Sequence, residues 1–201
     1  MSRIGVFGGT FDPVHKGHVL LAQDAALQAD LSRVIFMPAG IQPFKVGMVT
    51  AGAEERLAML KLAVEDHDNM DVSSIEVEAD RISYTYMTLR ILRGMLCPED
   101  RLFFISGTDT FLKLEKWKNS GALLRENSFI VGTRPGYREN ELERCMEILR
   151  GKYGTESIKI DNRELDISAT DIRKKLAEGK SIADIVPEKV ERYIRENELY
   201  K

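Results

Sequence analysis

The stretch of sequence that decides the fold runs from residue 3 to residue 18 and reads RIGVFGGTFDPVHKGH. Its first five residues form a compact apolar run, which predicts a buried β-strand. The glycine pair Gly8-Gly9 follows this run, and apolar residues at helical spacing continue over residues 19–29. Ligands of doubly wound α/β folds bind beyond the carboxyl ends of the strands, where the next helix begins. The stretch therefore predicts a strand, a binding turn and a helix in immediate succession.

Short apolar runs alternate with longer helical patterns along the rest of the chain. Strands are expected near residues 34–37, 70–77, 102–105, 129–132 and 157–160. Helices are expected over residues 54–64, 85–95 and 139–150, and from Thr170 and Pro187 onward. Continuous apolar strands that alternate with helices are typical of a parallel sheet covered on both faces. The expected fold is α/β: a single doubly wound, Rossmann-like domain over residues 1–201, with a mainly parallel sheet and helices on both faces.

Composition excludes several classes of protein. The chain has 201 residues, of which 43% are hydrophobic and 30% charged, as in an ordinary globular domain. A formal net charge of −3 argues against a binder of duplex nucleic acid. Cys97 and Cys145 lie far apart without further metal ligands, so we expect ordinary thiols in a reducing cytoplasm. No apolar stretch approaches the roughly 20 residues of a membrane span, so no membrane partner is expected.

The turn over residues 8–18 carries the chemistry expected of a phosphate site. Gly8 and Gly9 allow close backbone approach and positive φ, while Gly17 and His18 lie where the next helix exposes N–H groups. His15 and His18 are three residues apart, and imidazoles donate hydrogen bonds to phosphate oxygens. The alternative is that one histidine caps the helix and the other packs. The turn matches neither the Walker lysine motif nor the G-x-G-x-x-G fingerprint, and it lacks the further ligands of a metal site.

These residues carry a resemblance to a known family. The sequence GGTFDPVHKGH resembles the signature of the nucleotidyltransferase superfamily with the His-x-Gly-His motif. The variant is most similar to that of the bacterial nicotinate mononucleotide adenylyltransferases. The resemblance implies transfer of an adenylyl group from ATP to nicotinate mononucleotide in NAD biosynthesis, with release of pyrophosphate. It also implies Mg²⁺ held mainly by the phosphates and water, and a homo-oligomer is compatible with the sequence.

A second motif lies near the carboxyl end of the chain, where residues 166–173 read DISATDIR. Ser168 or Thr170 is suited to cap a helix, and Arg173 is suited to fork onto phosphate oxygens. In isolation the segment is better explained as a capped surface helix with a solvated arginine. It resembles the family's second motif, Ile-Ser-x-Thr-x-Ile-Arg, which embraces the ATP phosphates.

Two loops after predicted strands each supply a candidate cation. Residues 38–45 read PAGIQPFK, and Lys45 is a candidate phosphate contact, with a solvated loop lysine as the alternative. The family's loop commonly ends Pro-His-Lys, so Phe44 replaces an imidazole here. Arg134 follows the strand predicted over residues 129–132, as in the family, and is either a site residue or a turn-initiating surface arginine.

Three segments point to the acceptor nucleotide. Asp109 follows a predicted strand, where a carboxylate is able to accept hydrogen bonds from ribose hydroxyls. Trp117, the only tryptophan, is able to stack on a pyridine ring, with core packing as the alternative. The family shows the same tryptophan after Gly-x-Asp, and Ser83-Tyr84-Thr85 matches its Ser-Tyr-Thr segment at the nicotinate end. The family usually has an aspartate where this chain has Met87.

The residues and the resemblance together give one site hypothesis. The expected catalytic residues are His15, His18 and Arg173. The expected ATP and phosphate contacts are Gly8, Gly9, Thr10, Phe11, Gly17, Lys45, Gly107, Ile167, Ser168 and Thr170. The expected nicotinate-nucleotide contacts are Ser83, Tyr84, Thr85, Asp109, Trp117 and Arg134, and no metal ligand is expected.

Three alternative functions stay open at this point. Nicotinamide mononucleotide and phosphopantetheine adenylyltransferases share the superfamily motifs. Trp117 and the Ser83-Tyr84-Thr85 segment favour the nicotinate enzyme over the phosphopantetheine enzyme. The other alternative is a non-catalytic nucleotide-binding module, against which the intact His15, His18 and Arg173 argue.

Overall fold

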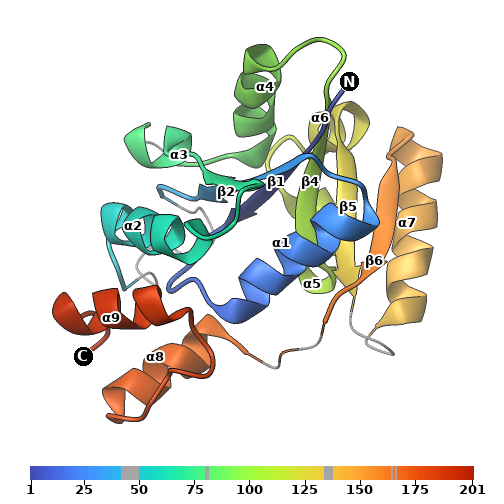
Figure 1. Ribbon diagram of the computed structural model, residues 1–201. Helices are drawn as coiled ribbons and strands as arrows, with labels where there is room; N and C mark the ends of the chain where they lie inside the picture. The colour runs from blue at the N-terminus through green and yellow to red at the C-terminus, as the bar shows by residue number, and fades with distance from the viewer. Residues whose placement is uncertain (42–49, 80–81, 134–137, 164, 166) are drawn as a thin grey trace. The chain divides into compact units, whose positions relative to one another are not determined.

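A computed structural model describes residues 1–41, 50–79, 82–133, 138–163, 165 and 167–201. Strands and helices alternate along the chain (Figure 1). They are β1 (Arg3–Gly9), α1 (Lys16–Gln28), β2 (Arg33–Pro38), α2 (Ala53–Val64), β3 (Met70–Val72), α3 (Ile75–Glu78), α4 (Thr85–Met95), β4 (Arg101–Gly107), α5 (Thr108–Phe111), the 3-10 turn η1 (Leu114–Lys116), α6 (Ser120–Glu126), β5 (Ser128–Thr133), α7 (Glu139–Tyr153), β6 (Ser157–Asp161), α8 (Ala169–Ala177) and α9 (Glu188–Glu196). The α/β class predicted from the alternating pattern is confirmed.

The sheet has the strand order of a doubly wound fold. Within the described ranges its six strands follow the order β3-β2-β1-β4-β5-β6. β1 pairs in parallel with β4, with Val6 opposite Phe104, and β4 and β5 continue the parallel pairing outward to β6. The order therefore reverses between β1 and β4, and ligands bind at such a switch point beyond the carboxyl ends of the strands. Gly8 near the end of β1 and Gly107 at the end of β4 lie at this edge.

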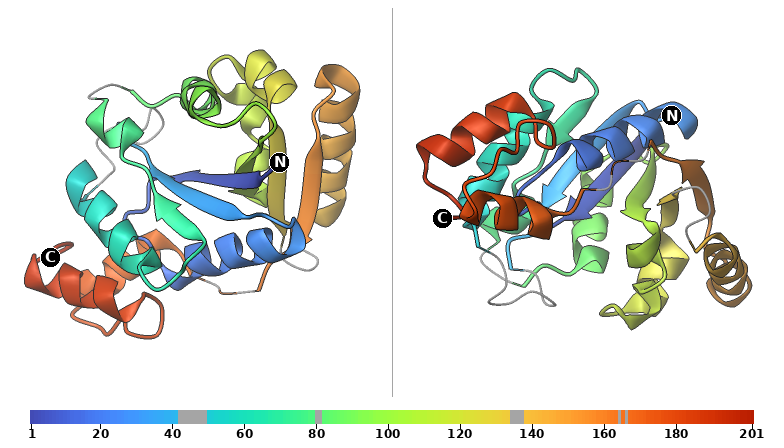
Figure 2. Two further views of the ribbon diagram at one scale, coloured as in Figure 1. Left: turned by 45° about the horizontal axis from the view of Figure 1, so that its top comes forward. Right: turned by 90° about the horizontal axis from the view of Figure 1, so that it is seen from below.

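The chain divides into two compact units, and the first contains the longer strands. It comprises Met1–Gly8, Leu21–Ile35 and Tyr84–Arg163. Its core is aromatic: Phe103, Phe111 and Phe129 are fully buried, and the last two meet edge to face with ring centroids 5.9 Å apart. α7 runs beside β6 in every view (Figures 1 and 2).

The second unit gathers three separate stretches of sequence. It comprises Gly9–Leu20, Phe36–Ser83 and Glu164–Lys201. α2 packs against β3 and against the C-terminal helix α9. Val190 and Ile194 are the buried apolar residues of α9. Packing of buried apolar side chains therefore holds α9 against α2, which lies more than a hundred residues earlier in the sequence.

Two expectations about the elements need correction. The strand predicted over residues 70–77 ends at Val72, because Ser73 and Ser74 begin the helical turn α3 with side-chain hydrogen bonds. α1 begins at Lys16, ahead of the apolar pattern that starts at Val19. The short helices α3, α5 and α6 were not predicted, since four to seven residues are too few to show a helical period.

Candidate active site

The turn after β1 is built around a buried aromatic ring. Phe11 is 2% exposed and has a φ of 52°, a left-handed conformation that is uncommon for a bulky residue. A Cβ atom at Gly9 would lie 2.9 Å from the Phe11 ring, so only glycine fits there. Glycine at positions 8 and 9 would allow positive φ, but in this turn Phe11 adopts it, and Gly9 serves close approach.

The two histidines of the motif lie against each other. Their rings stack with centroids 3.7 Å apart, and the edge of Phe11 meets His18 at 5.0 Å. The backbone N–H of His15 donates to Nδ1 of His18 at 3.3 Å. Because Nδ1 accepts this bond, the proton of a neutral His18 ring lies on Nε2. His18 is therefore held in the tautomer whose Nε2 carries the proton.

His15 is the more deeply buried of the pair, at 7% exposed. Burial lowers its pKa to about 4, so the ring is neutral at pH 7. Its Nδ1 atom has no hydrogen-bond partner in the part of the chain that the structure describes. A Cβ atom at Gly17 would lie 3.1 Å from that nitrogen, and glycine leaves the space beside it open. A buried polar atom without a hydrogen-bond partner is unusual, and contact with a ligand is one explanation for it.

The start of α1 offers fewer free backbone donors than its sequence predicts. The N–H of Lys16 donates to the carbonyl of Ile185 at 3.0 Å, and that of His18 donates to the carbonyl of His15 at 2.9 Å. The Lys16 ammonium donates to the carbonyls of Ala183 and Asp184, each at 3.1 Å. Anion binding at this turn therefore depends chiefly on side chains.

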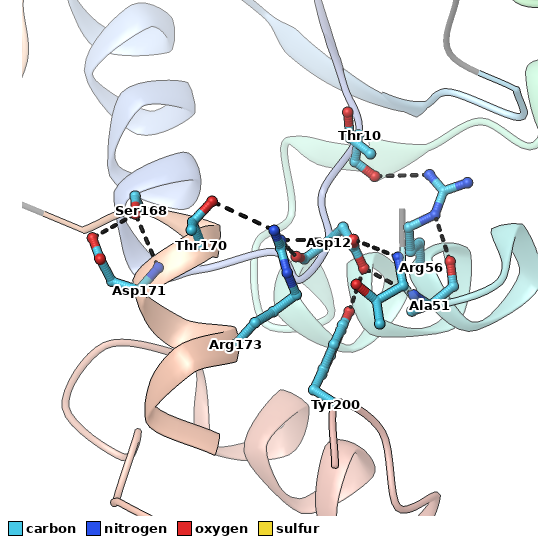
Figure 3. A network of polar contacts seen from close by, with 10 residues as sticks. Thr10, Asp12, Ala51, Arg56, Ser168, Thr170, Asp171, Arg173 and Tyr200 are labelled. Carbon is cyan, nitrogen blue, oxygen red and sulfur yellow. Dashed lines mark hydrogen bonds and ion pairs between the residues drawn. The ribbon is translucent and has the colours of Figure 1, made fainter. Parts of the chain in front are cut away.

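Asp12 sits at the centre of a buried polar network (Figure 3). Its carboxylate, in a residue 4% exposed, accepts hydrogen bonds from the N–H of Thr50 at 2.9 Å, the N–H of Ala51 at 3.1 Å and the hydroxyl of Tyr200 at 2.8 Å. Its backbone carbonyl accepts a hydrogen bond from Nη1 of Arg173 at 2.6 Å. The same nitrogen lies 3.7 Å from the carboxylate, which completes an ion pair.

Arg56 fixes the backbone of this network. It is 2% exposed and donates to the carbonyls of Thr10 at 2.8 Å, Gly40 at 3.1 Å and Ala51 at 3.3 Å. Burial lowers its pKa, and the negative charge of Asp12 opposes that shift. Three loop segments are thus held by one guanidinium. Together with Arg173 it leaves one positive charge in excess over Asp12, which suits an anionic ligand.

The second motif reaches the first through Arg173 (Figure 3). Ser168 is the N-cap of α8, as predicted: its hydroxyl accepts from the N–H of Asp171 at 3.1 Å and donates to the Asp171 carboxylate at 2.5 Å. Arg173 lies one turn into the helix, and its Nη2 donates to the Thr170 hydroxyl at 3.4 Å. Ile167, before the cap, is half-buried. The structure brings the two motifs together within the second unit.

The first unit holds candidates for the acceptor end. A Cβ atom at Gly107 would meet no atom within 4 Å, so the end of β4 is open on that side. Asp109 is exposed and pairs with Arg138 at 2.7 Å. Trp117 is only partly buried, and its ring meets Phe104 edge-on with centroids 6.0 Å apart. Trp117 is therefore not an ordinary core residue.

The Ser83-Tyr84-Thr85 segment spans the boundary between the two units. In the second unit, Ser83 accepts a hydrogen bond from the N–H of Gly40 at 3.1 Å, which ties it to the loop after β2. In the first unit, Tyr84 is the N-cap residue of α4 and Thr85 its first residue. Met87 lies half-buried in the first turn of that helix.

Some predicted residues lie outside the description, and some important ones were not predicted. Lys45, Phe44 and Arg134 fall outside the described residues. Arg56 and Tyr200 were not predicted. Arg56 had a signal, because it occupies the same helical stripe as the apolar residues of α2; Tyr200, at the chain terminus, had none.

The described ranges lack two further features. No group of three or more His, Cys, Asp or Glu side chains there is arranged to hold a metal ion. None of the helices found there combines the length and apolarity required to cross a bilayer.

Comparison with known proteins agrees with the fold and the motifs. The family model described as cytidylyltransferase-like matches residues 6–175. A relative from Clostridium beijerinckii, named "Probable nicotinate-nucleotide adenylyltransferase", is 37% identical over 204 residues and covers 100% of both chains. One of the same name from Moorella thermoacetica is 39% identical, over 99% of this chain and 92% of the relative.

Solved structures share the fold. Plasmodium falciparum nicotinic acid mononucleotide adenylyltransferase complexed with NaAD has a TM-score of 0.81 at 19% identity, over 100% of this chain and 98% of that one. The same enzyme complexed with APC has a TM-score of 0.79 at 18% identity with the same coverage.

The switch-point sheet, the paired histidines and the arginine of the second motif define a nucleotidyltransferase of the cytidylyltransferase-like class. Within that class the chain belongs to the nicotinate-nucleotide adenylyltransferase family.

Proposed function

We propose that this chain joins ATP and nicotinate mononucleotide to form nicotinate adenine dinucleotide and pyrophosphate. The observation that carries the proposal is the convergence of two motifs within the second unit. Arg173 donates to the backbone of Asp12, only a few residues from the stacked His15 and His18. Cationic and neutral hydrogen-bond donors are thus gathered on one turn, as phosphate transfer requires.

The chemistry is a direct displacement at phosphorus. A 5′-phosphate oxygen of the acceptor nucleotide forms a bond to the α-phosphorus of ATP, while the bond from that phosphorus to the bridging oxygen of pyrophosphate breaks. No side-chain nucleophile takes part, so the protein contributes positioning and charge stabilisation. Mg²⁺ arrives with ATP as part of the substrate, and phosphates and water supply most of its ligands. The Asp12 carboxylate fits this assignment, because its hydrogen bonds are already directed to Thr50, Ala51 and Tyr200.

The roles on the ATP side follow from the contacts. The Nε2–H of His18 is the donor that strengthens as charge develops on the α-phosphate, and neutral His15 and Thr10 hold neighbouring oxygens. Arg173, Ser168 and Lys45 bind the triphosphate and the departing pyrophosphate. The remaining residues shape the path of the backbone around the nucleotide: Gly8, Gly9, Phe11, Gly17, Gly107, Ile167 and Thr170.

The roles on the acceptor side rest on the chemistry of the side chains. Trp117 presents an indole that is only partly buried, which suits stacking on the pyridine ring. Asp109 accepts from the ribose hydroxyls once Arg138 gives up its ion pair. Ser83, Tyr84, Thr85 and Arg134 complete the nicotinate end. We assign residues 1–201 to one nucleotidyltransferase domain acting in the cytoplasm.

Pyrophosphate release tests the proposal. The full-length protein is mixed with Mg-ATP and, in parallel, with nicotinate mononucleotide, nicotinamide mononucleotide or phosphopantetheine. We expect the fastest release with the nicotinate nucleotide. Faster release with either of the other acceptors would overturn the substrate assignment, and no release with any of them would overturn the enzymatic assignment.

A further inference from the structure

The penultimate residue of the chain is buried in the polar network of the motif turn. Tyr200 is 7% exposed and lies four residues beyond the end of α9. Glu198 and Tyr200 have φ angles of 54° and 63°, which side-chain-bearing residues adopt only where their surroundings hold them. The N–H of Leu199 donates to the carbonyl of Ile194 at 3.0 Å and turns the chain back on its helix. The terminus is therefore folded into place rather than trailing from the helix.

The hydroxyl of Tyr200 has a specific partner. It donates to Oδ1 of Asp12 at 2.8 Å, across 188 positions of sequence (Figure 3). Among the described residues, the other hydrogen bonds to this carboxylate come from the backbone N–H groups of Thr50 and Ala51. Burial, and then the negative charge of Asp12, raise the pKa of Tyr200, so the phenol remains a donor.

The same carboxylate faces Arg173. Nη1 of Arg173 is 3.7 Å from Oδ2 of Asp12, too far for a hydrogen bond, whereas the contact with the Asp12 backbone carbonyl is 2.6 Å. A buried carboxylate that loses a donor draws a neighbouring cation closer, because a poorly satisfied buried charge is costly. Without the phenol, Asp12 would compete with phosphate oxygens for the Arg173 guanidinium.

We propose that Tyr200 is a positioning residue, whose hydroxyl satisfies Asp12 and thereby keeps the Arg173 guanidinium available to the triphosphate of ATP. The inference rests on the proposed function, because the phosphate contact of Arg173 is part of it. Tyr200 does not touch the nucleotide; it acts through Asp12.

The first test compares two tyrosines of the C-terminal segment. Tyr200→Phe removes the hydroxyl and keeps the buried ring. Tyr193→Phe is the matched control, because Tyr193 is half-buried on α9 and its hydroxyl makes no hydrogen bond to the described residues. We expect Tyr200→Phe to raise the KM for ATP about tenfold, with the KM for the acceptor unchanged. Equal effects of the two variants, or equal increases in both KM values, would overturn the proposal.

The second test separates positioning from packing by a double-mutant cycle. Calorimetry measures the Kd of a non-transferable ATP analogue for wild type, Tyr200→Phe, Arg173→Ala and the double variant. Since Tyr200 acts through Arg173, its substitution should weaken binding about tenfold in wild type and less than about twofold in Arg173→Ala. The same loss in both backgrounds would show a merely structural role.

The binding cycle also distinguishes failure of this inference from failure of the proposed function. It uses no acceptor nucleotide and needs no turnover. A wild type that binds the analogue but releases no pyrophosphate with any acceptor contradicts the proposed function, while the cycle still decides the role of Tyr200. A wild type that does not bind the analogue overturns the inference itself.

Discussion

At the scale of single residues, the two histidines of the motif differ because their burial and partners differ. His15 is enclosed, and its neutral ring keeps an Nδ1 atom without a partner among the described residues. His18 is half-buried, and a backbone N–H fixes its tautomer. A neutral imidazole with Nε2–H is a good donor to an oxygen on which charge develops during transfer. The structure thus separates two residues that look equivalent in the sequence.

Substitution of His18 tests that difference. His18→Ala should lower kcat by at least about 10²–10³-fold, because a preorganised donor to the transition state is lost. The Kd for ATP, measured by calorimetry, should stay close to that of wild type. His67→Ala is the matched control, since His67 is the third histidine of the chain and lies outside the motif. Near-normal turnover of His18→Ala would contradict the assignment.

The burial of His15 predicts a pH dependence of stability. Its pKa is about 4 in the folded protein, compared with 6.5 for an unperturbed ring. Between these values the unfolded state binds more protons, so the free energy of unfolding should rise with pH from about 4 to 6.5 and level off above. The full effect of this group is up to about 3 kcal/mol. Urea unfolding at several pH values in this range gives the free energy of unfolding at each pH. This free energy should rise less steeply with pH for His15→Gln than for wild type. An equal rise in the two proteins would show that groups other than His15 cause the dependence.

At the scale of elements, one side chain of α2 holds loops from separate parts of the second unit. Arg56 donates to the turn after β1, to the loop after β2 and to Ala51, two residues before its own helix. Its charge also offsets that of buried Asp12. Helix α2 is therefore part of the site although none of its residues belongs to either motif.

Removal of Arg56 should destabilise the fold. Arg56→Met removes the donor to three carbonyls and a positive charge that offsets buried Asp12, and breaking such buried interactions typically costs about 3–5 kcal/mol. Chemical denaturation measures the change. Arg90→Met is the control, because Arg90 is exposed in its ion pair with Glu126, and it should change stability little. Equal effects of the two variants would contradict the role given to Arg56.

At the scale of the whole molecule, the strand order determines where chemistry is possible. β1 and β4 are parallel neighbours, so their carboxyl ends lie at one edge, and the reversal of strand order between them makes that edge the switch point where ligands bind. Gly8 and Gly107 lie near these ends. The polar groups at this edge in the described residues include no metal-binding cluster. We expect a divalent ion to arrive with the nucleotide, held mainly by the phosphates and water.

Chelation distinguishes a metal ion that accompanies the substrate from one that stabilises the protein. EDTA in excess should abolish pyrophosphate release, because the phosphates then lack the ion that neutralises their charge. The melting temperature of the nucleotide-free protein should not change. A lower melting temperature with EDTA alone would reveal a metal held by the protein and contradict our assignment.

Much of this description was predictable from local pattern. Residues 85–95 form the helix α4 that their spacing predicted, and Ser168, one of the two expected caps, is the N-cap of α8. The predictions that were wrong also concern local structure. Ser73 and Ser74 ended a strand that continued alternation would have extended, and Phe11 took the positive φ expected of a glycine. Propensity was overridden where side-chain hydrogen bonds or ring packing contributed more.

The sequence by itself determined the alternating fold, the strand–turn–helix at the first motif and the resemblance to a nucleotidyltransferase. These features depend on periodicity and motif spacing, which involve residues close together in the sequence. Only the tertiary structure decided which residues support the motif. Arg56 meets Thr10 across 46 positions and Tyr200 meets Asp12 across 188. Contacts at such separations arise from folding the chain back on itself, and no local pattern encodes their partners. The buried charge of Asp12 is the physical reason these distant donors are needed.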